Sequence, residues 1–202
     1  MSTIIAESIK EKFSYKEYRE YMSALLKQGL STGHTQNEDL MHYSTLNEVR
    51  MNRLDKTIVL LGEAEEALKN LKKEYTLLVI SEGWCGDAAQ ILPVMNKITE
   101  ATPKLEMEIV LRDDNPQLMD EYLTNGARSI PKLILIEKET NTVRGSWGPR
   151  PHGALQLVLD YKEKHGVFDM DAKTALQKWY LEDKGLSTVE EIVLLLKTAD
   201  SL

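Results

Sequence analysis

Apolar and polar positions in the middle of the chain alternate in blocks that predict a sheet flanked by helices. The segments 75–81, 105–113 and 132–137 are short apolar runs with β-branched residues, which is typical of buried strands. The segment 142–146 follows the turn 138–141 and reads as the second strand of a hairpin. Helical periodicity marks the segments 86–100, 115–124 and 154–164. The order strand, helix, strand, helix, strand, strand, helix predicts an α/β fold with a mixed central sheet and helices on both faces.

Both ends of the chain predict helices. Residues 5–28 carry apolar residues near helical spacing, with a break in phase at Ser14. Ser14 and Glu17 match a capping box, which would start a new helix. The pattern therefore fits either one helix or two short ones. The polar segment 29–39 reads as a loop, and 58–61 fits either a strand or a helical continuation. Two further helices are predicted before the sheet, over 45–56 with a capping box of Thr45 and Glu48, and over 63–73. Two more are predicted at the C-terminal end: one over 171–183 with Gly185 as its C-cap, and a last one that starts at a capping box of Ser187 and Glu190.

Composition and charge narrow the class of protein. The 202 residues are 42% hydrophobic and 28% charged, as in an ordinary soluble domain. A formal net charge of -7 argues against nucleic acid as a partner, because phosphate contacts need a basic surface. No apolar run reaches the length of a membrane span, and residues 1–20 lack the apolar core of a signal peptide, so we expect a cytoplasmic protein that does not enter membranes.

The chain contains one cysteine and four scattered histidines. An internal disulfide is therefore excluded, and no set of metal ligands is apparent, since Cys85 and Asp87 would supply only two. We expect neither a metal nor another cofactor.

Cys85 lies between a predicted buried strand and a predicted helix. The free N–H groups and positive dipole end of a helix N-terminus stabilise a thiolate, which is the reactive form of cysteine, so this position is expected to lower the pKa of Cys85. Gly86 lets the backbone approach the sulfur, whereas the carboxylate of Asp87 opposes a second negative charge. The alternative is that Cys85 is a buried, inert thiol, which is the commoner state of a lone cysteine.

The segment Trp84-Cys85-Gly86-Asp87-Ala88 resembles the Trp-Cys-Gly-Pro-Cys active site of thioredoxins. Three further segments resemble the same family in the same order: Asp113–Pro116 at the end of a strand, Ala127–Pro131 like the loop before the family's cis-proline, and Gly148 after the last strand. The resemblance covers about residues 57–164 and implies a thioredoxin-like fold. The whole chain resembles a bacterial group of this family that has Trp-Cys-Gly-Asp and a helical N-terminal extension.

The resemblance also implies roles for individual residues. Cys85 would be the nucleophile that attacks a disulfide or a sulfenic acid, with no cofactor. Pro131 would be cis and would face Cys85, and the peptide at Ile130 would offer backbone groups to an extended substrate. The expected substrate groove consists of Trp84, Gly86, Asp87, Ile130, Pro131, Trp147 and Gly148. A trans proline at a strand start and a stiff turn over 147–151 are the structural alternatives, and Gln90 and Arg150 are expected to be merely solvated.

Departures from the family pattern bear on activity. Ala88 stands where the family has its second, resolving cysteine, and Asp87 stands where it has proline. The family's buried acid and its lysine partner correspond to Val79 and Ile109. Without a resolving thiol, a mixed disulfide persists until an outside thiol attacks it.

The predicted domain organisation is a helical extension (1–56), a thioredoxin-like domain (57–165) and a second helical extension (166–202). Two functions remain open for this chain. The first is monothiol thiol–disulfide exchange through Cys85, serving cell redox homeostasis, with a protein or low-molecular-weight thiol or disulfide as partner. The second is a redox-inactive module that binds a protein or peptide. The extensions favour the second function, because they add surface that thioredoxin chemistry does not need. The alternative explanations for that surface are that it shields the sheet or forms a homodimer contact.

Overall fold

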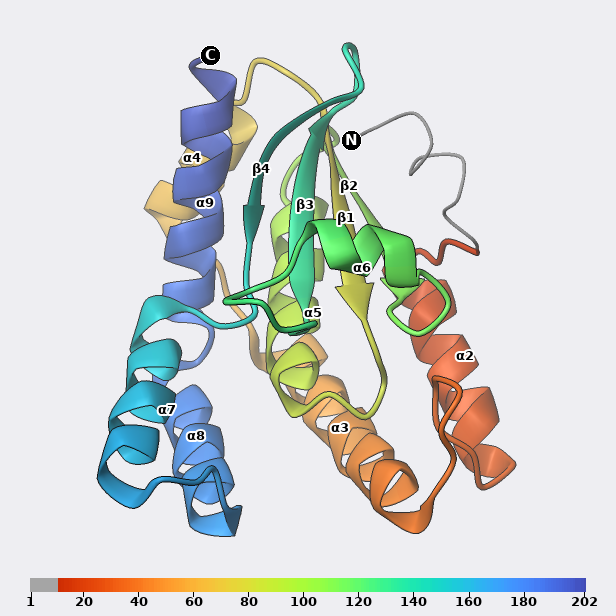
Figure 1. Ribbon diagram of the computed structural model, residues 1–202. Helices are drawn as coiled ribbons and strands as arrows, with labels where there is room; N and C mark the ends of the chain where they lie inside the picture. The colour runs from red at the N-terminus through yellow and green to blue at the C-terminus, as the bar shows by residue number, and fades with distance from the viewer. Residues whose placement is uncertain (1–10) are drawn as a thin grey trace.

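The computed structural model describes residues 11–202, and a four-stranded mixed sheet lies at its centre (Figure 1). The strands are β1 (Tyr75–Ser81), β2 (Leu105–Leu111), β3 (Lys132–Glu137) and β4 (Thr142–Trp147), in the spatial order β2-β1-β3-β4. β1 pairs in parallel with β2 and antiparallel with β3, which in turn pairs antiparallel with β4. The predicted α/β fold with a mixed sheet is confirmed.

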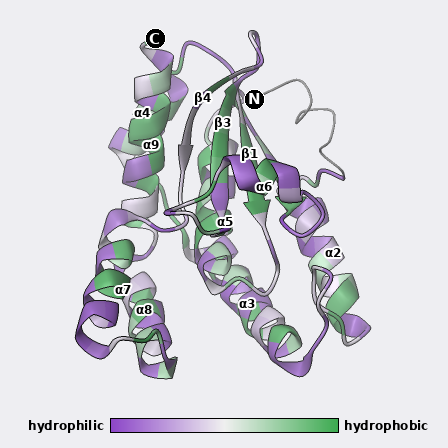
Figure 2. Ribbon diagram, viewed as in Figure 1, coloured by the Kyte–Doolittle hydropathy of each residue, from purple (hydrophilic) through white to green (hydrophobic). Residues whose placement is uncertain are grey.

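The central strands are apolar because helices cover both faces of the sheet. All residues of β3, and all of β1 except Thr76, are buried. In Figure 1, α5 (Gly86–Glu100) lies behind the sheet and α6 (Pro116–Glu121) crosses in front of it. Figure 2 shows the hydrophobic residues concentrated on β1, β3 and α5, whereas the outlying helices carry more polar residues.

The N-terminal helices are α2 (Tyr15–Lys27), α3 (Glu38–Thr57) and α4 (Gly62–Lys69). The capping box of Ser14 and Glu17 is confirmed. The helix predicted ahead of it is wrong at residues 11–13, which are not helical, and its part before residue 11 lies outside the described residues. Ahead of α2, Phe13 exchanges two backbone hydrogen bonds with Ile109 and so extends the sheet edge at β2.

The predicted start of the next helix at Thr45 is wrong. α3 begins at Glu38, because the Asn37 side chain accepts a hydrogen bond from the Leu40 N–H at 2.8 Å and caps the helix there. Thr45 lies inside α3, where its hydroxyl donates to the Met41 carbonyl. Residues 58–61 form neither a strand nor a helix, and α4 ends at Lys69, earlier than predicted.

The C-terminal helices are α7 (His152–His165), α8 (Met170–Asp183) and α9 (Leu186–Asp200). Lys184, rather than Gly185, is the C-cap of α8, and Gly185 is the N-cap of α9. The predicted capping box of Ser187 and Glu190 is wrong, because the Ser187 hydroxyl donates to Asp183 instead. α9 packs against β4, α4 and α5, so the last helix belongs to the body of the fold.

None of the helices within residues 11–202 is both long and apolar enough to cross a membrane.

Candidate functional site

Cys85 is the N-cap of α5 and lies at the end of the turn that follows β1. Its Sγ accepts a hydrogen bond from the Ala88 N–H at 3.5 Å and donates one to the Ile130 carbonyl oxygen at 3.3 Å. The peptide bond between Ile130 and Pro131 is cis, as predicted. The helix N-terminus and the cis-proline loop therefore meet at the sulfur.

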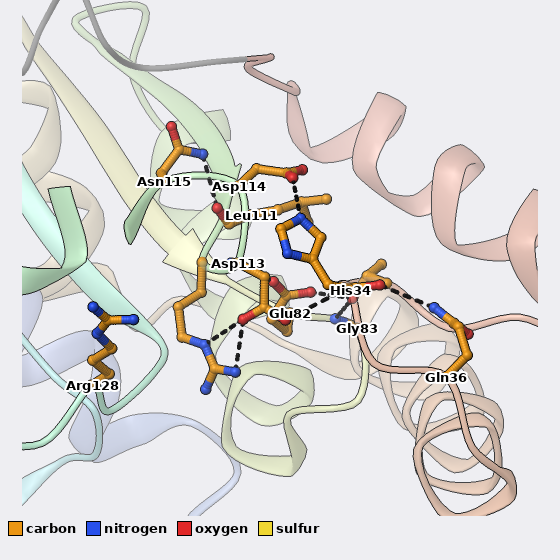
Figure 3. Close-up of polar contacts among 12 residues, drawn as sticks. His34, Gln36, Glu82, Gly83, Leu111, Asp113, Asp114, Asn115 and Arg128 are labelled. Atoms are coloured by element: carbon orange, nitrogen blue, oxygen red, sulfur yellow. Dashed lines mark hydrogen bonds and ion pairs between the residues drawn. The ribbon is translucent and has the colours of Figure 1, made fainter. Parts of the chain in front are cut away.

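The turn that carries Trp84 and Cys85 is held by polar side chains of the N-terminal segment. Figure 3 shows Glu82 and Gly83, which begin this turn, beside the segment that carries His34. The Thr32 hydroxyl donates to the buried carboxyl of Glu82 and accepts a hydrogen bond from the Gly83 N–H at 2.7 Å. Asn47, on α3, donates to the Gly83 carbonyl at 2.9 Å. Two parts of the extension thus fix the backbone immediately before the thiol.

The loop after β2 joins the same network. The Asp113 N–H donates to Glu82 at 3.0 Å, and its carboxylate accepts two hydrogen bonds from the Arg112 guanidinium at 2.8 and 2.9 Å. The guanidinium of Arg112 in turn lies 4.7 Å from the ring centroid of Trp84. Figure 3 also shows His34, whose Nε2 lies 2.8 Å from the Asp114 carboxylate. These contacts hold Arg112 over the indole beside Cys85.

Burial decides the ionisation of Cys85. Its side chain is 8% exposed, and the pKa of the Cys85 thiol is raised to about 12, first by burial and second by the Asp87 carboxylate. The hydrogen bonds from the first turn of α5 and the charge of Arg150 oppose this rise without overcoming it. The expectation of a lowered pKa is therefore wrong, although the predicted opposition from Asp87 is confirmed.

Asp87 is buried in a three-residue cluster. Arg150 contacts it with two nitrogens, Nε at 3.0 Å from Oδ1 and Nη2 at 2.6 Å from Oδ2, and the Tyr180 hydroxyl donates to Oδ1 at 2.9 Å. Burial of the Arg150 guanidinium lowers its pKa, but the charge and hydrogen bonds of the Asp87 carboxylate raise the pKa of Arg150 overall. Arg150 was expected to be solvated; it is instead the counter-ion of the carboxylate next to the thiol.

A cavity of about 450 Å³ opens above Cys85. Four of the predicted groove residues line it together with Cys85: Trp84, Gly86, Asp87 and Ile130. Pro131, Trp147 and Gly148 are not among its lining residues. Trp147 turns its indole N–H to Glu191 on α9 at 2.7 Å, and Gly148 packs against the Pro131 carbonyl.

Most of the remaining lining comes from helices that the resemblance does not cover. α3, α8 and Phe168, two residues before α8, contribute apolar and aromatic side chains, and both helices contribute cations. The residues are Leu40, Tyr43, Arg50, Phe168, Lys173, Leu176 and Gln177. The Gln177 side-chain carbonyl accepts a hydrogen bond from Gln90 at 2.7 Å, so Gln90 is buried rather than solvated as expected. The spacing of Lys173, Leu176 and Gln177 places them on one helical face, which was the only signal in the sequence for this wall.

No group of three or more His, Cys, Asp or Glu side chains within residues 11–202 is arranged to hold a metal ion.

The chain matches the family model described as Thioredoxin over residues 33–165. It is 32% identical over 98 residues to a Streptomyces coelicolor protein named Putative thioredoxin 2, an alignment that covers 48% of this chain and 68% of that protein.

Solved structures resemble most of the chain, among them the following two. One is a protein of unknown function from Pseudomonas aeruginosa, with a TM-score of 0.61 and 19% identity, covering 93% of this chain and 99% of that one. The other is an HIV epitope scaffold, with a TM-score of 0.55 and 19% identity, covering 92% and 98%. These similarities concern the fold alone, and their coverage extends beyond residues 33–165.

Proposed function

Because the chain belongs to the thioredoxin family, we propose that it catalyses monothiol thiol–disulfide exchange through Cys85. The Cys85 thiolate attacks one sulfur of a disulfide, forms a mixed disulfide and releases the other half as a thiolate, which takes up a proton. An external thiolate then attacks the mixed disulfide and releases the Cys85 thiolate. The electrons balance, since one disulfide is consumed and one is formed.

The observation that carries this proposal is the position of the sulfur. Cys85 Sγ lies at the N-terminus of α5, contacts the carbonyl before a cis-proline at 3.3 Å, and is reached through a cavity of about 450 Å³. An incoming disulfide in that cavity would meet the sulfur and the Ile130 carbonyl together. A packing role for the thiol would require no such opening.

An external resolving thiol is part of the proposal because the chain has no second cysteine. Ala88, one helical turn into α5 at the position of the family's resolving thiol, is buried and apolar. As a setting we propose the bacterial cytoplasm, where reduced low-molecular-weight thiols are available to resolve the adduct.

The test is the formation and release of an adduct with the neutral compound 2-hydroxyethyl disulfide, followed by intact-protein mass spectrometry. We expect one adduct on the native protein, its release by added 2-mercaptoethanol, and no adduct on Cys85→Ser. Because the thiol has a pKa of about 12, the rate should rise about tenfold per pH unit between about pH 7 and 9, without a plateau. An adduct that forms only in denaturant would contradict the proposal.

The burial of Cys85 and its raised pKa favour a second candidate, a redox-inactive module that binds a protein or peptide partner. The same measurement separates the two candidates. A native thiol that stays unmodified up to about pH 9, while the denatured chain reacts promptly, would favour the module.

A further inference from the structure

We propose that the cavity above Cys85 is an anion site, and that the small-molecule substrate of the exchange is a carboxylate-bearing low-molecular-weight disulfide. The choice of substrate rests on the proposed function, whereas anion binding by the cavity does not. The argument starts from the charges that line the cavity and from the partners of each.

Among residues 11–202, five cationic side chains line the cavity, and Asp87 is the one acidic side chain that does so. Three of the cations already have carboxylate partners: Arg112 pairs with Asp113, Arg128 with Asp120, and Arg150 with Asp87. The other two, Arg50 and Lys173, have no carboxylate within 4.0 Å in this part of the chain. The cavity therefore keeps an excess of positive charge in a chain whose net charge is -7.

Arg50 stands beside the first turn of α5. Its Nη1 donates to the Asn47 side-chain oxygen at 2.8 Å and lies 3.7 Å from the position that a Cβ on Gly86 would take. The guanidinium is half-buried, and this burial lowers its pKa, although an arginine remains charged at neutral pH. Partial burial removes hydration from this cation, and no carboxylate replaces the lost water. An anion that entered the cavity would compensate for that loss, because charge-assisted hydrogen bonds are strong.

Lys173 reaches the same cavity from α8. Its Nζ donates to the Tyr43 hydroxyl at 3.1 Å and lies 5.1 Å from the centroid of that ring, which leaves donors of the ammonium group free for a ligand. Arg50 and Lys173 thus come from the N-terminal and C-terminal helices and converge on one space. Neither belongs to the strands or to α5, so the extensions supply this charge.

Size and polarity favour a small ligand over a peptide strand. A volume of about 450 Å³ lies in the range of small-molecule sites. The aromatic and aliphatic walls formed by Trp84, Phe168 and Leu176 suit a short carbon chain that carries a carboxylate to the cations and a sulfur to Cys85. Asp87 does not repel such a ligand strongly, because Arg150 neutralises it.

The test compares three small disulfides of similar size: anionic 3,3′-dithiodipropionate, neutral 2-hydroxyethyl disulfide and cationic cystamine. Each rate is divided by the rate of the same disulfide with free 2-mercaptoethanol, because the leaving thiols differ in pKa. On this scale we expect the anionic compound to form the Cys85 adduct about tenfold faster than the neutral one, and cystamine to be the slowest. The anionic-to-neutral rate ratio should fall about threefold to tenfold in Arg50→Gln and in Lys173→Gln, and it should fall with added salt.

Matched controls lie on the same helices. Arg53 on α3 and Lys178 on α8 are exposed and do not line the cavity, so Arg53→Gln and Lys178→Gln remove the same charge from the chain and should keep the wild-type ratio. Equal rates for the three disulfides, or a ratio that falls as much in the controls, would overturn the anion site.

Binding of 3,3′-dithiodipropionate to Cys85→Ser, measured by calorimetry, separates this inference from the proposed function. Suppose that no disulfide reacts with the native protein, that Cys85→Ser binds the dianion, and that the double variant with Arg50→Gln does not bind it. Exchange is then refuted and the anion site stands. If all three disulfides react at the same rate and Cys85→Ser shows no binding, exchange stands and the anion site is refuted. If there is neither reaction nor binding, both are refuted.

Discussion

At the scale of the residue, Cys85 illustrates a competition between two electrostatic effects. The N-terminus of α5 offers hydrogen bonds and a favourable dipole to a thiolate. Removal from water and the neighbouring Asp87 act in the opposite direction and prevail, because the sulfur is 8% exposed. The thiol is thus protonated at neutral pH, and its reactivity depends on the few groups that can still favour the thiolate.

Asp87 can be tested directly by the substitution Asp87→Asn. Removing the carboxylate and leaving the charge of Arg150 should lower the pKa of Cys85, so that alkylation by iodoacetamide at about pH 8 becomes faster. The same change leaves Arg150 without its counter-ion and should lower the free energy of unfolding by about 3 kcal/mol.

Tyr180→Phe is the comparison for Asp87→Asn. It removes only the hydroxyl that donates to Asp87 and keeps the ion pair, so it should cost about 1 kcal/mol in urea unfolding. If folded Asp87→Asn were alkylated no faster than the wild type, the assigned influence of Asp87 on the thiol would be incorrect.

At the scale of the element, the end of β4 shows how two loops are held together behind the thiol. Gly148 has a φ of 108°, and a Cβ there would lie 2.5 Å from the Pro131 carbonyl oxygen. The loop before β3 and the turn after β4 can therefore meet only if residue 148 has no side chain. Gly148 was expected to line the groove. It instead packs against the Pro131 carbonyl, in the loop whose Ile130 carbonyl contacts Cys85.

We expect Gly148→Ala to lower the free energy of unfolding by about 3 kcal/mol, because it combines an unfavourable φ with a backbone clash. Gly126→Ala is the matched control, since Gly126 has a φ of 75° but a Cβ added there would meet nothing within 4 Å, and it should cost about 1 kcal/mol. Urea unfolding measures both values. Equal losses would mean that the contact with Pro131 carries no weight.

At the scale of the whole molecule, the C-terminal helix closes onto the start of the central strand. The Asp200 carboxylate, at the end of α9, accepts hydrogen bonds from the Lys72 and Lys73 N–H groups at 2.8 and 2.9 Å and from the Tyr75 hydroxyl at 3.2 Å. This joins the last helix to the entry of β1. The C-terminal extension is thereby attached to the sheet at one end and reaches the cavity through α8 at the other.

Asp200→Asn is expected to lower the free energy of unfolding by about 1 kcal/mol near neutral pH. Although partial burial opposes it, these hydrogen bonds hold the pKa of Asp200 below its usual value of 3.8. The stabilisation is therefore present above the usual pKa and is lost as the pH falls through the lower folded-state value. In urea unfolding, the difference between wild type and variant should shrink below about pH 4.

Glu190→Gln is the control for that experiment, because Glu190 is an exposed acid on the same helix. It should leave both the stability near neutral pH and its change in acid close to those of the wild type. A pH-independent loss in Asp200→Asn would mean that packing rather than the carboxylate charge holds the helix end.

Local patterns in the sequence were enough to predict the sheet and the place of the thiol. The predicted strand 75–81 and helix 86–100 match β1 and α5, because a short apolar run and a helical period depend on neighbours within a few residues. The cis peptide before Pro131 was likewise expected from a resemblance of a few residues. The predicted start of α3 was wrong, because the Asn37 side chain caps the helix ahead of the second plausible cap at Thr45.

Tertiary structure alone decided the ionisation of Cys85 and the walls of its cavity. The pKa of the thiol depends on its burial in the folded chain, and the cavity beside it is lined by residues of α3 and α8, which lie far from residue 85 in the chain. The pairing of Asp87 with Arg150 and Tyr180 also joins residues that no local pattern relates, and so does the lining of one cavity by Arg50 and Lys173. Periodicity acts over a few residues, whereas desolvation and charge act through space, so these properties emerge only when the chain is folded.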